Sequence, residues 1–372
     1  MLLHPLAGST PNNWQKLKRE NGGIDASSLF SALKITLSTF SGLPFKAVED
    51  FKFGQKIEQV DIAVPPVFII GHWRSGTTYF HRMMCLDDRF GHMTNFQSFL
   101  PHVYMGGRKL WQPIFKMTMP RKRPMDNVEY RLGSPEEEEY ALGNVSPYSF
   151  YHCMYFPRNM RRLFDQSLLF EGLSESDVAS WKRSFLNTLK KLTLSTGGKQ
   201  LLLKNPANTA RIDTLLELFP NAKFIHIYRD PLAVFSSTKR FYEKMLPHYA
   251  LQKYTEQEIE DNIILFYQQL MTRFFETKDL IPPENFIEIR YEDFVGNEVD
   301  ILRQVYSQFQ LPDFKAVEGE VTKSVSASKN YKSNRYCIDE KTLEKVTDQW
   351  AFSIEKWKAS EFKVNREKEL AQ

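Results

Sequence analysis

A glycine-rich loop, Gly71-His-Trp-Arg-Ser-Gly76-Thr77-Thr78, lies between a predicted buried strand at residues 64–70 and a predicted helix that begins near Thr77. In this context successive backbone N–H groups and the helix N-terminus point at one anion, so the loop could bind a phosphate. Its G-x-x-x-x-G spacing matches a Walker A loop, but Thr77 stands where an NTPase has the lysine that reaches the β and γ phosphates. The cation of this loop is instead Arg74, which lies upstream.

A second polar motif follows another apolar run, at residues 223–228. Arg229 ends this predicted strand, and Ser237 lies eight residues later, on the helix that Asp230 and Pro231 predict. A guanidinium supplies a fork of charged donors and a serine supplies a hydroxyl, so the two side chains can converge on one phosphate. The alternative is an arginine paired with Asp230 and a serine that caps a turn.

These two motifs, in this order, resemble those of the sulfotransferases that use 3′-phosphoadenosine 5′-phosphosulfate (PAPS). The resemblance implies that Arg74, often a lysine in that family, stabilises charge on the bridging oxygen as the sulfuryl group leaves. It also implies that Arg229 and Ser237 bind the 3′-phosphate, which ATP lacks. The 5′-phosphate would be held by four residues of the loop: Ser75, Gly76, Thr77 and Thr78.

Two further segments resemble the family more loosely. Tyr291, at the end of a predicted strand, is similar to the tyrosine of the family's Tyr-Glu-Asp segment, which lies near the adenine. Lys332 and Arg335 lie where the family has a late basic loop over the 3′-phosphate, although the common Arg-Lys-Gly triplet is absent. A buried tyrosine without a ligand and a solvated basic loop are the alternatives.

The resemblance extends over residues 64–335. The segments around Asp126 and at residues 134–142 are similar to the acidic segment of a mostly bacterial subfamily whose loop reads His-Trp-Arg-Ser-Gly-Thr-Thr. This similarity favours the bacterial-type subfamily over the cytosolic drug-conjugating branch.

Sulfuryl transfer makes the same demands as phosphoryl transfer, because an in-line attack leaves charge on the departing phosphate oxygen. Positioned cations contribute most of the catalysis in such reactions. Arg74 and Lys204 are the candidates, since Lys204 ends the predicted strand at residues 200–204 and matches the lysine of the family's Lys-Thr-His motif. The alternative for Lys204 is a strand-end lysine whose amine reaches solvent.

An acceptor hydroxyl also needs a general base. Pro206 stands where cytosolic members have their catalytic histidine, and Asn95 stands where protein-tyrosine sulfotransferases have a glutamate. The remaining candidates are Glu137 and Glu139, ranked above His72 of the loop.

The glutamates at residues 136–139 could instead be a solvated helix start, because acids favour a helix N-terminus. Helical spacing predicts that at most one or two of the four point inward. His81 and His226 are expected to be structural.

The elements that must position these residues alternate along the chain. Apolar runs predict strands at residues 64–70, 200–204, 223–228 and 286–290, and helical patterns follow them. The alternation predicts an α/β fold, a P-loop-type parallel sheet flanked by helices. We expect one domain over residues 1–372, with an N-terminal helical cap (1–60), a mostly helical or irregular substrate-covering insertion (90–160) and a C-terminal helix and tail (340–372).

The predicted helix at residues 26–40 has an apolar, aromatic face. Such a face packs against the rest of a protein more often than it lies on a membrane, so we expect it to be covered.

Composition excludes several classes of protein. The 372 residues carry 49 Lys and Arg against 45 Asp and Glu, a formal charge of +4, which is too small an excess for a protein that coats nucleic acid. Cys85, Cys153 and Cys337 match no disulfide or metal pattern, and we expect free thiols. There is no signal-peptide pattern and no apolar run long enough for a membrane span, so a cytoplasmic protein is expected.

The sequence therefore predicts a PAPS-dependent sulfotransferase that acts on a hydroxyl or amine of a small organic acceptor and requires no metal. Aromatic residues between positions 90 and 156 could line an apolar acceptor pocket, although core packing explains them equally well. One alternative is a P-loop ATP- or GTP-dependent kinase or hydrolase with Asp230 as its magnesium-side acid; another is a scaffold without activity. Oligomeric state is not predicted.

Overall fold

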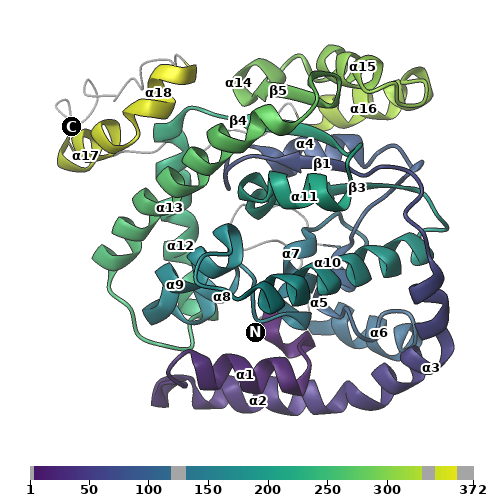
Figure 1. Cartoon of the computed structure of the whole chain (residues 1–372), viewed down its shortest axis with the longest axis vertical. Coiled ribbons are helices and arrows are strands. Elements are labelled where there is room, and N and C mark those ends of the chain that lie inside the picture. The colour runs from purple at the N-terminus through teal and green to yellow at the C-terminus, as the bar shows by residue number, and fades with distance from the viewer. Residues whose placement is uncertain (1–3, 119–130, 329–339, 358–372) are drawn as a thin grey trace.

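A five-stranded parallel sheet forms the centre of the computed structural model, which describes residues 4–118, 131–328 and 340–357 (Figure 1). Its order is β2-β3-β1-β4-β5, and β1 is buried throughout because helices cover both faces. The strands are β1 (Val67–Ile70), β2 (Phe90–Gly91), β3 (Gln200–Lys204), β4 (Lys223–Tyr228) and β5 (Phe286–Arg290). The predicted α/β fold class is confirmed. The edge strand β2 was not predicted, because two residues are too short a run to show a pattern.

Side-chain caps fix several helix starts, including the one predicted at Asp230. Ser174 and Thr255 each form a reciprocal capping box, with Asp177 and Glu258 respectively, and the Asp230 carboxylate accepts backbone N–H groups of the next helix. The helices of this part are α4 (Thr77–Met84), α10 (Glu175–Ser195), α11 (Ile212–Leu218), α12 (Pro231–Tyr249) and α13 (Glu256–Thr277), with the short 3₁₀ helix η5 (Pro206–Ala210) after β3.

The segment between β2 and α10 is mostly helical, as predicted. It contains α5 (Asn95–Phe99), α6 (Arg108–Thr118), α7 (Glu138–Val145), α8 (His152–Tyr155), η3 (Pro157–Asn159), α9 (Met160–Phe164) and η4 (Asp165–Leu169). Its buried aromatic residues include Tyr104, Phe115, Tyr148 and Tyr151. Among these four residues, core packing is therefore the alternative that the structure favours over a pocket lining.

The N-terminal elements form one edge of the molecule, at the bottom of Figure 1. They are η1 (Pro5–Gly8), α1 (Pro11–Glu20), η2 (Ala26–Ser28), α2 (Leu29–Ser41) and α3 (Leu43–Gln59). The expectation that the aromatic face of α2 is covered was wrong, because Phe30 and Leu37 are 67% and 62% exposed. The helix instead buries its opposite face, with Ala32, Ile35 and Thr39, while the larger side chains point to solvent.

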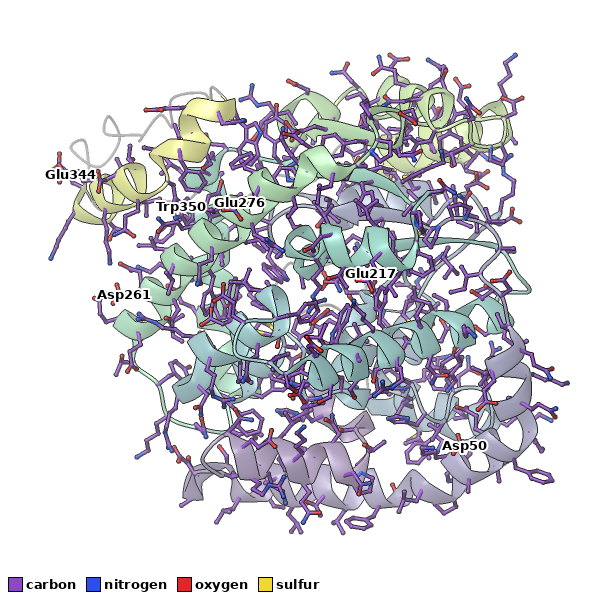
Figure 2. The ribbon with its side chains drawn as sticks, viewed as in Figure 1. Asp50, Glu217, Asp261, Glu276, Glu344 and Trp350 are labelled. Atoms are coloured by element: carbon purple, nitrogen blue, oxygen red, sulfur yellow. The ribbon has the colours of Figure 1, made fainter. Side chains whose placement is uncertain are left out.

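The C-terminal helices return to the sheet side of the molecule. Trp350 joins them to α13, since its indole Nε1 donates to the Ile264 carbonyl at 3.0 Å and its ring stacks on Tyr267 at 3.7 Å (Figure 2). No helix in the described ranges is long and apolar enough to cross a membrane. The remaining elements are η6 (Lys278–Leu280), η7 (Pro283–Asn285), α14 (Tyr291–Phe294), α15 (Glu298–Gln308), α16 (Lys315–Ser328), α17 (Glu340–Gln349) and α18 (Ala351–Trp357).

Candidate functional site

The loop between β1 and α4 has an unusual backbone. Gly71, Arg74 and Gly76 have φ values of +135°, +72° and +96°. A Cβ on Gly71 would lie 2.1 Å from the Ile227 carbonyl oxygen, so only glycine fits beside β4. The Ser75 amide and hydroxyl both donate to the His72 carbonyl, at 3.2 and 2.7 Å, which closes the loop into a compact turn. Thr77 and Thr78 then begin α4, whose N-terminus carries the partial positive charge that an anion needs.

Side chains that follow three adjacent strands, β1, β4 and β5, meet around this loop. The Arg74 Nε donates to the Ser237 hydroxyl at 3.0 Å, and the Arg229 Nη1 lies 3.4 Å from the Arg74 carbonyl oxygen. The Arg229 guanidinium lies over the Tyr291 ring, 4.7 Å from its centroid. That ring packs against Gly76, where a Cβ would come within 2.1 Å of it. The structure therefore brings together five of the predicted residues, four of which follow β1, β4 or β5, with Ser237 from α12.

Part of the Arg229 guanidinium lacks a hydrogen-bond partner. Its Nε is buried and makes no hydrogen bond to the described residues; the nearest carboxylate oxygen, of Glu292, is 3.9 Å away. A buried donor of this kind is costly unless a ligand satisfies it. The guanidinium thus fits a phosphate-binding role.

Lys204, at the end of β3, joins the start of α4 to Glu137. Its side chain is 2% exposed, and its Nζ lies 3.3 Å from the Thr78 hydroxyl and forms an ion pair with Glu137. The Tyr151 hydroxyl donates to the second oxygen of the same carboxylate at 2.5 Å. Burial raises the pKa of Tyr151 well above its ordinary value, so this hydroxyl keeps its proton. Lys204 thus connects the predicted loop to one of the predicted bases.

Glu139 is bound differently from Glu137. Its oxygens accept from both Arg211 Nη atoms, at 2.9 and 3.2 Å, and from the Asn205 amide at 2.7 Å. Burial alone would raise the pKa of Glu139, but the charge and hydrogen bonds of Arg211 hold it below the ordinary value. Glu139 is therefore a charged structural partner of Arg211, and its contacts do not include the loop.

All four glutamates are buried, so the prediction that at most one or two point inward was wrong. Helical spacing does not apply to the whole run, because α7 begins only at Glu138 and Glu137 has an extended backbone. Glu138 is fully buried, with one oxygen accepting from the Asn208 amide at 2.8 Å. Burial, reinforced by the neighbouring carboxylates, raises the pKa of Glu138 to about 7.

The histidines near the site are buried and neutral at physiological pH. The His72 Nδ1–H donates to the Trp73 carbonyl at 2.7 Å, and burial lowers the pKa of His72 to about 4. Burial likewise lowers the pKa of His81 and of His226, whose Nδ1 lies 3.0 Å from Glu288.

A mostly apolar pocket lies beside the loop. It is lined by His72, Trp73, Phe150, Thr238, Phe241, Tyr242, Ile263 and Phe266. Trp73 stacks on Phe150 at 3.8 Å, and the Arg74 guanidinium lies 5.9 Å from the Phe241 ring centroid, so the pocket reaches the cationic cluster.

Some predicted residues lie outside the part of the chain that the structure describes. Some residues that contact the loop or the glutamates were not predicted. Lys332, Arg335 and Asp126 lie outside the described residues. Thr209, whose hydroxyl accepts the Gly71 amide at 2.8 Å, and Arg211 were missed. The polar run after β3, from Asn205 to Arg211, was a visible signal, but it also has the form of a helix start.

Comparison with known proteins identifies the family. Residues 65–315 match the model of the sulfotransferase family, so the chain belongs to that family and is a sulfotransferase. It is 31% identical over 308 residues to the omega-hydroxy-beta-dihydromenaquinone-9 sulfotransferases Stf3 of Mycobacterium bovis and Mycobacterium tuberculosis, covering 82% of this chain and 78% of each relative.

Two crystal structures share its fold at 15% sequence identity. Sulfotransferase STF9 from Mycobacterium avium matches with a TM-score of 0.70, covering 95% of this chain and 97% of that one. Sulfotransferase STF1 from Mycobacterium tuberculosis H37Rv matches with a TM-score of 0.64, covering 93% and 94%.

We expect Arg211→Met to destabilise the protein by about 3–5 kcal/mol, because it leaves the Glu139 charge buried without its partner. The double variant Arg211→Met/Glu139→Gln should recover part of that loss. Urea denaturation measures both free energies of unfolding. Arg303→Met, which removes an exposed ion pair, is the control and should change little; an Arg211→Met protein as stable as this control would contradict the assignment.

We expect Glu138→Gln to remove a pH dependence of stability. Between pH about 4.5 and about 7 the folded state keeps a proton that the unfolded chain has lost, so the free energy of unfolding falls as pH rises across this window. Glu138→Gln should therefore gain up to about 3 kcal/mol over wild type at pH 8 and little at pH 4.5. Urea titrations at both pH values test this, with the exposed Glu171→Gln as control; an equal gain at both would exclude titration of Glu138.

Proposed function

We propose that this sulfotransferase uses PAPS as its donor and transfers the sulfuryl group to a hydroxyl, or an amine, of a lipophilic acceptor. The observation that carries the proposal is the convergence of Arg74, Ser237, Arg229 and Tyr291 around Gly76. PAPS supplies an activated sulfuryl group and carries a second phosphate. A site with two arginines beside a phosphate loop is suited to a donor with that much negative charge.

The nucleotide end would be held by the arginine cluster. Arg229, with its unsatisfied buried Nε, and Ser237 would bind the 3′-phosphate, and Tyr291 would make a ring contact with the adenine. The turn from Ser75 to Gly76 and the first residues of α4 would hold the 5′-phosphate through backbone N–H groups. The Arg74 side chain contacts Ser237, so its positive charge would act on the 3′-phosphate as well as beside the loop.

The reacting end would be served by Lys204 and Glu137. Lys204 contacts Thr78 at the start of α4, where its ammonium can stabilise negative charge that develops on the leaving oxygen. We assign the general base to Glu137, because its carboxylate contacts Lys204 and is positioned by Tyr151. Glu139 is held by Arg211, and the His72 ring donates to the Trp73 carbonyl, so both are weaker choices than the glutamate that contacts Lys204.

The pocket beside the loop suggests the class of acceptor. Its lining is largely aromatic and aliphatic, including Trp73, Phe150, Phe241 and Phe266. The two Mycobacterium relatives are named for a hydroxylated menaquinone. We therefore propose an apolar alcohol as the acceptor. The three cations Arg74, Lys204 and Arg229 would offset the donor charge without a metal ion.

Adenosine 3′,5′-bisphosphate should stabilise the wild type, by about 2.7 kcal/mol at 100 times its Kd, because it binds only the folded state. Arg229→Ala should lower the affinity about 10- to 100-fold through loss of charge-assisted hydrogen bonds. Thermal shift assays measure both effects. Arg273→Ala, which removes an arginine paired with Asp213 away from the loop, should bind as wild type. Stronger stabilisation by ATP with magnesium would instead favour a P-loop kinase or hydrolase.

Glu137→Gln should lower kcat about 10²- to 10⁴-fold, because it removes the proton acceptor while keeping the shape of the side chain. Binding of adenosine 3′,5′-bisphosphate should be unchanged. Sulfate transfer from radiolabelled PAPS to a long-chain alcohol measures the rate. Glu138→Gln is the matched control and should keep near wild-type kcat; a loss confined to Glu138→Gln would move the base to that residue.

A further inference from the structure

The N-terminal edge of the molecule exposes many large apolar side chains. We define the apolar edge by three groups of residues: Leu29, Phe30, Leu33, Leu37 and Phe40 of α2; Leu43, Val48 and Phe51 of α3; and Leu110 and Met117 of α6. Phe51 and Met117 are 91% and 86% exposed. Large exposed patches of this kind mark interaction surfaces, whereas single exposed apolar residues need no explanation.

The five residues of α2 form one stripe along the helix. Their spacing places them within about 100° of the helix circumference. Ala32, Ile35 and Thr39 occupy the opposite face and are buried. The stripe therefore points away from the protein along the length of α2, and Figure 1 shows no element beyond this edge.

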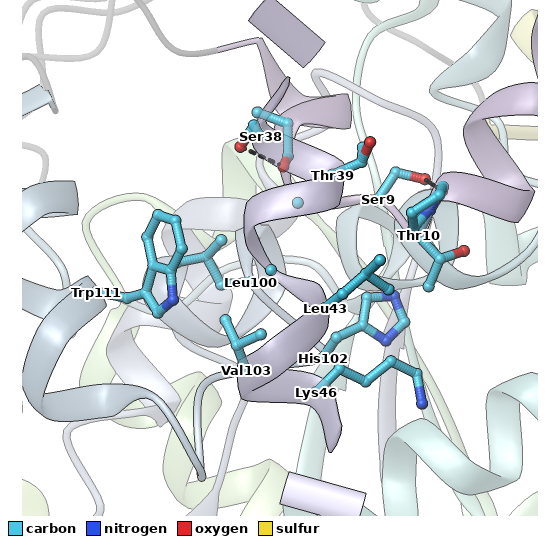
Figure 3. A pocket seen from close by; sticks show the side chains of 14 residues that line it. Ser9, Thr10, Ser38, Thr39, Leu43, Lys46, Leu100, His102, Val103 and Trp111 are labelled. Carbon is cyan, nitrogen blue, oxygen red and sulfur yellow. Dashed lines mark hydrogen bonds between the residues drawn. The ribbon is translucent and has the colours of Figure 1, made fainter. Parts of the chain in front are cut away.

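Contacts of α3 with α6 and with the turn before α6 hold these two helices together. The Trp111 ring meets Phe45 edge to face at 5.7 Å, and the buried Glu49 carboxylate accepts the backbone N–H groups of Met105 and Gly106 at 2.8 and 2.9 Å. The ends of α2 and α3 also share a pocket with Trp111 (Figure 3), lined by residues that include Ser38, Leu43, Lys46 and Val103.

Positive charge borders the apolar edge. Helix α2 carries Lys34, and α6 carries Arg108, Lys109 and Lys116, while neither helix has an acidic residue. Helix α3 is balanced, with three lysines and three acids. Over the whole chain the two signs are nearly equal, 49 to 45, so four cations without a carboxylate on these two helices are a local excess.

We propose that the apolar edge binds the surface of an anionic lipid bilayer, with α2 and α6 lying in the plane of the interface. Helices that insert an apolar face between headgroups and carry lysine or arginine beside it have this character. A second copy of the chain is a poorer occupant, because a two-fold contact would bring the same cations together. The binding mode goes beyond sulfuryl transfer and does not depend on it.

The test is co-sedimentation of the full chain with vesicles, without PAPS or acceptor. We expect binding to phosphatidylcholine vesicles that contain about 30% phosphatidylglycerol, and binding at least about tenfold weaker to phosphatidylcholine alone or in high salt. Failure to bind either vesicle would overturn the proposal whatever the enzymatic activity is.

Substitutions separate vesicle binding through the apolar edge from nonspecific hydrophobic adsorption. Phe30→Gln/Leu33→Gln/Leu37→Gln should weaken binding about 100-fold, because three large side chains no longer enter the bilayer. The single variants Leu37→Gln and Leu280→Gln form a matched pair, since these leucines are 62% and 58% exposed but only Leu37 belongs to the apolar edge. Equal effects of the two single variants would contradict the proposal.

Charge variants test whether binding depends on attraction between the lysines of α6 and anionic lipid. Lys109→Gln/Lys116→Gln should weaken binding to anionic vesicles about 30-fold, while Lys315→Gln/Lys341→Gln on α16 and α17 should not. Sedimentation velocity provides the remaining control. A dimer that the triple variant dissociates, together with no vesicle binding, would assign the apolar edge to a second copy of the chain and overturn the bilayer proposal.

Discussion

Three consecutive carboxylates hold the helical segment between β2 and α10 to the sheet. Glu137 pairs with Lys204, Glu138 accepts from Asn208, and Glu139 pairs with Arg211. All three carboxyl groups are buried. Their cationic partners keep the charges of Glu137 and Glu139 in the interior, whereas Glu138 has one oxygen without a partner and a raised pKa. Lys204 at the end of β3, together with Asn208 and Arg211 of the polar run that follows it, provides these partners. The position of α7 relative to the loop depends on this set of contacts.

The same contacts link structure to chemistry. Glu139 is fixed by an arginine and two amide donors, which makes it part of the framework. Glu137, two residues earlier, reaches the lysine that contacts the first turn of α4. Because Glu139 is fully paired, it holds Glu137 at a fixed distance from the loop, where Glu137 would meet a reacting group. Burial, reinforced by the charges of Glu139 and Glu137, raises the pKa of Glu138.

Sheet topology accounts for the arginine cluster. Because β1 lies between β3 and β4, and β5 follows β4, the carboxyl ends of four parallel strands meet at one edge. Lys204, the loop, Arg229 and Tyr291 each follow one of these strands. The apolar edge lies on α2, α3 and α6 instead, so lipid binding and sulfuryl transfer would use different elements of one chain.

The sequence by itself determined the features that depend on local order along the chain. Four strands, the helix start at Asp230, the loop and the arginine eight residues before Ser237 were all predicted, since strand runs, caps and glycine spacing are short-range signals. Only the tertiary structure decided which acids are buried and what they contact. Glu137 and Lys204 are 67 residues apart, and an acidic run has the same pattern whether it meets water or buried cations. The apolar face of α2 was visible too, but a stripe of leucine and phenylalanine does not reveal which side of a helix the rest of the protein will cover. That choice depends on the packing of Ala32 and Ile35 against other elements, which is a property of the folded chain.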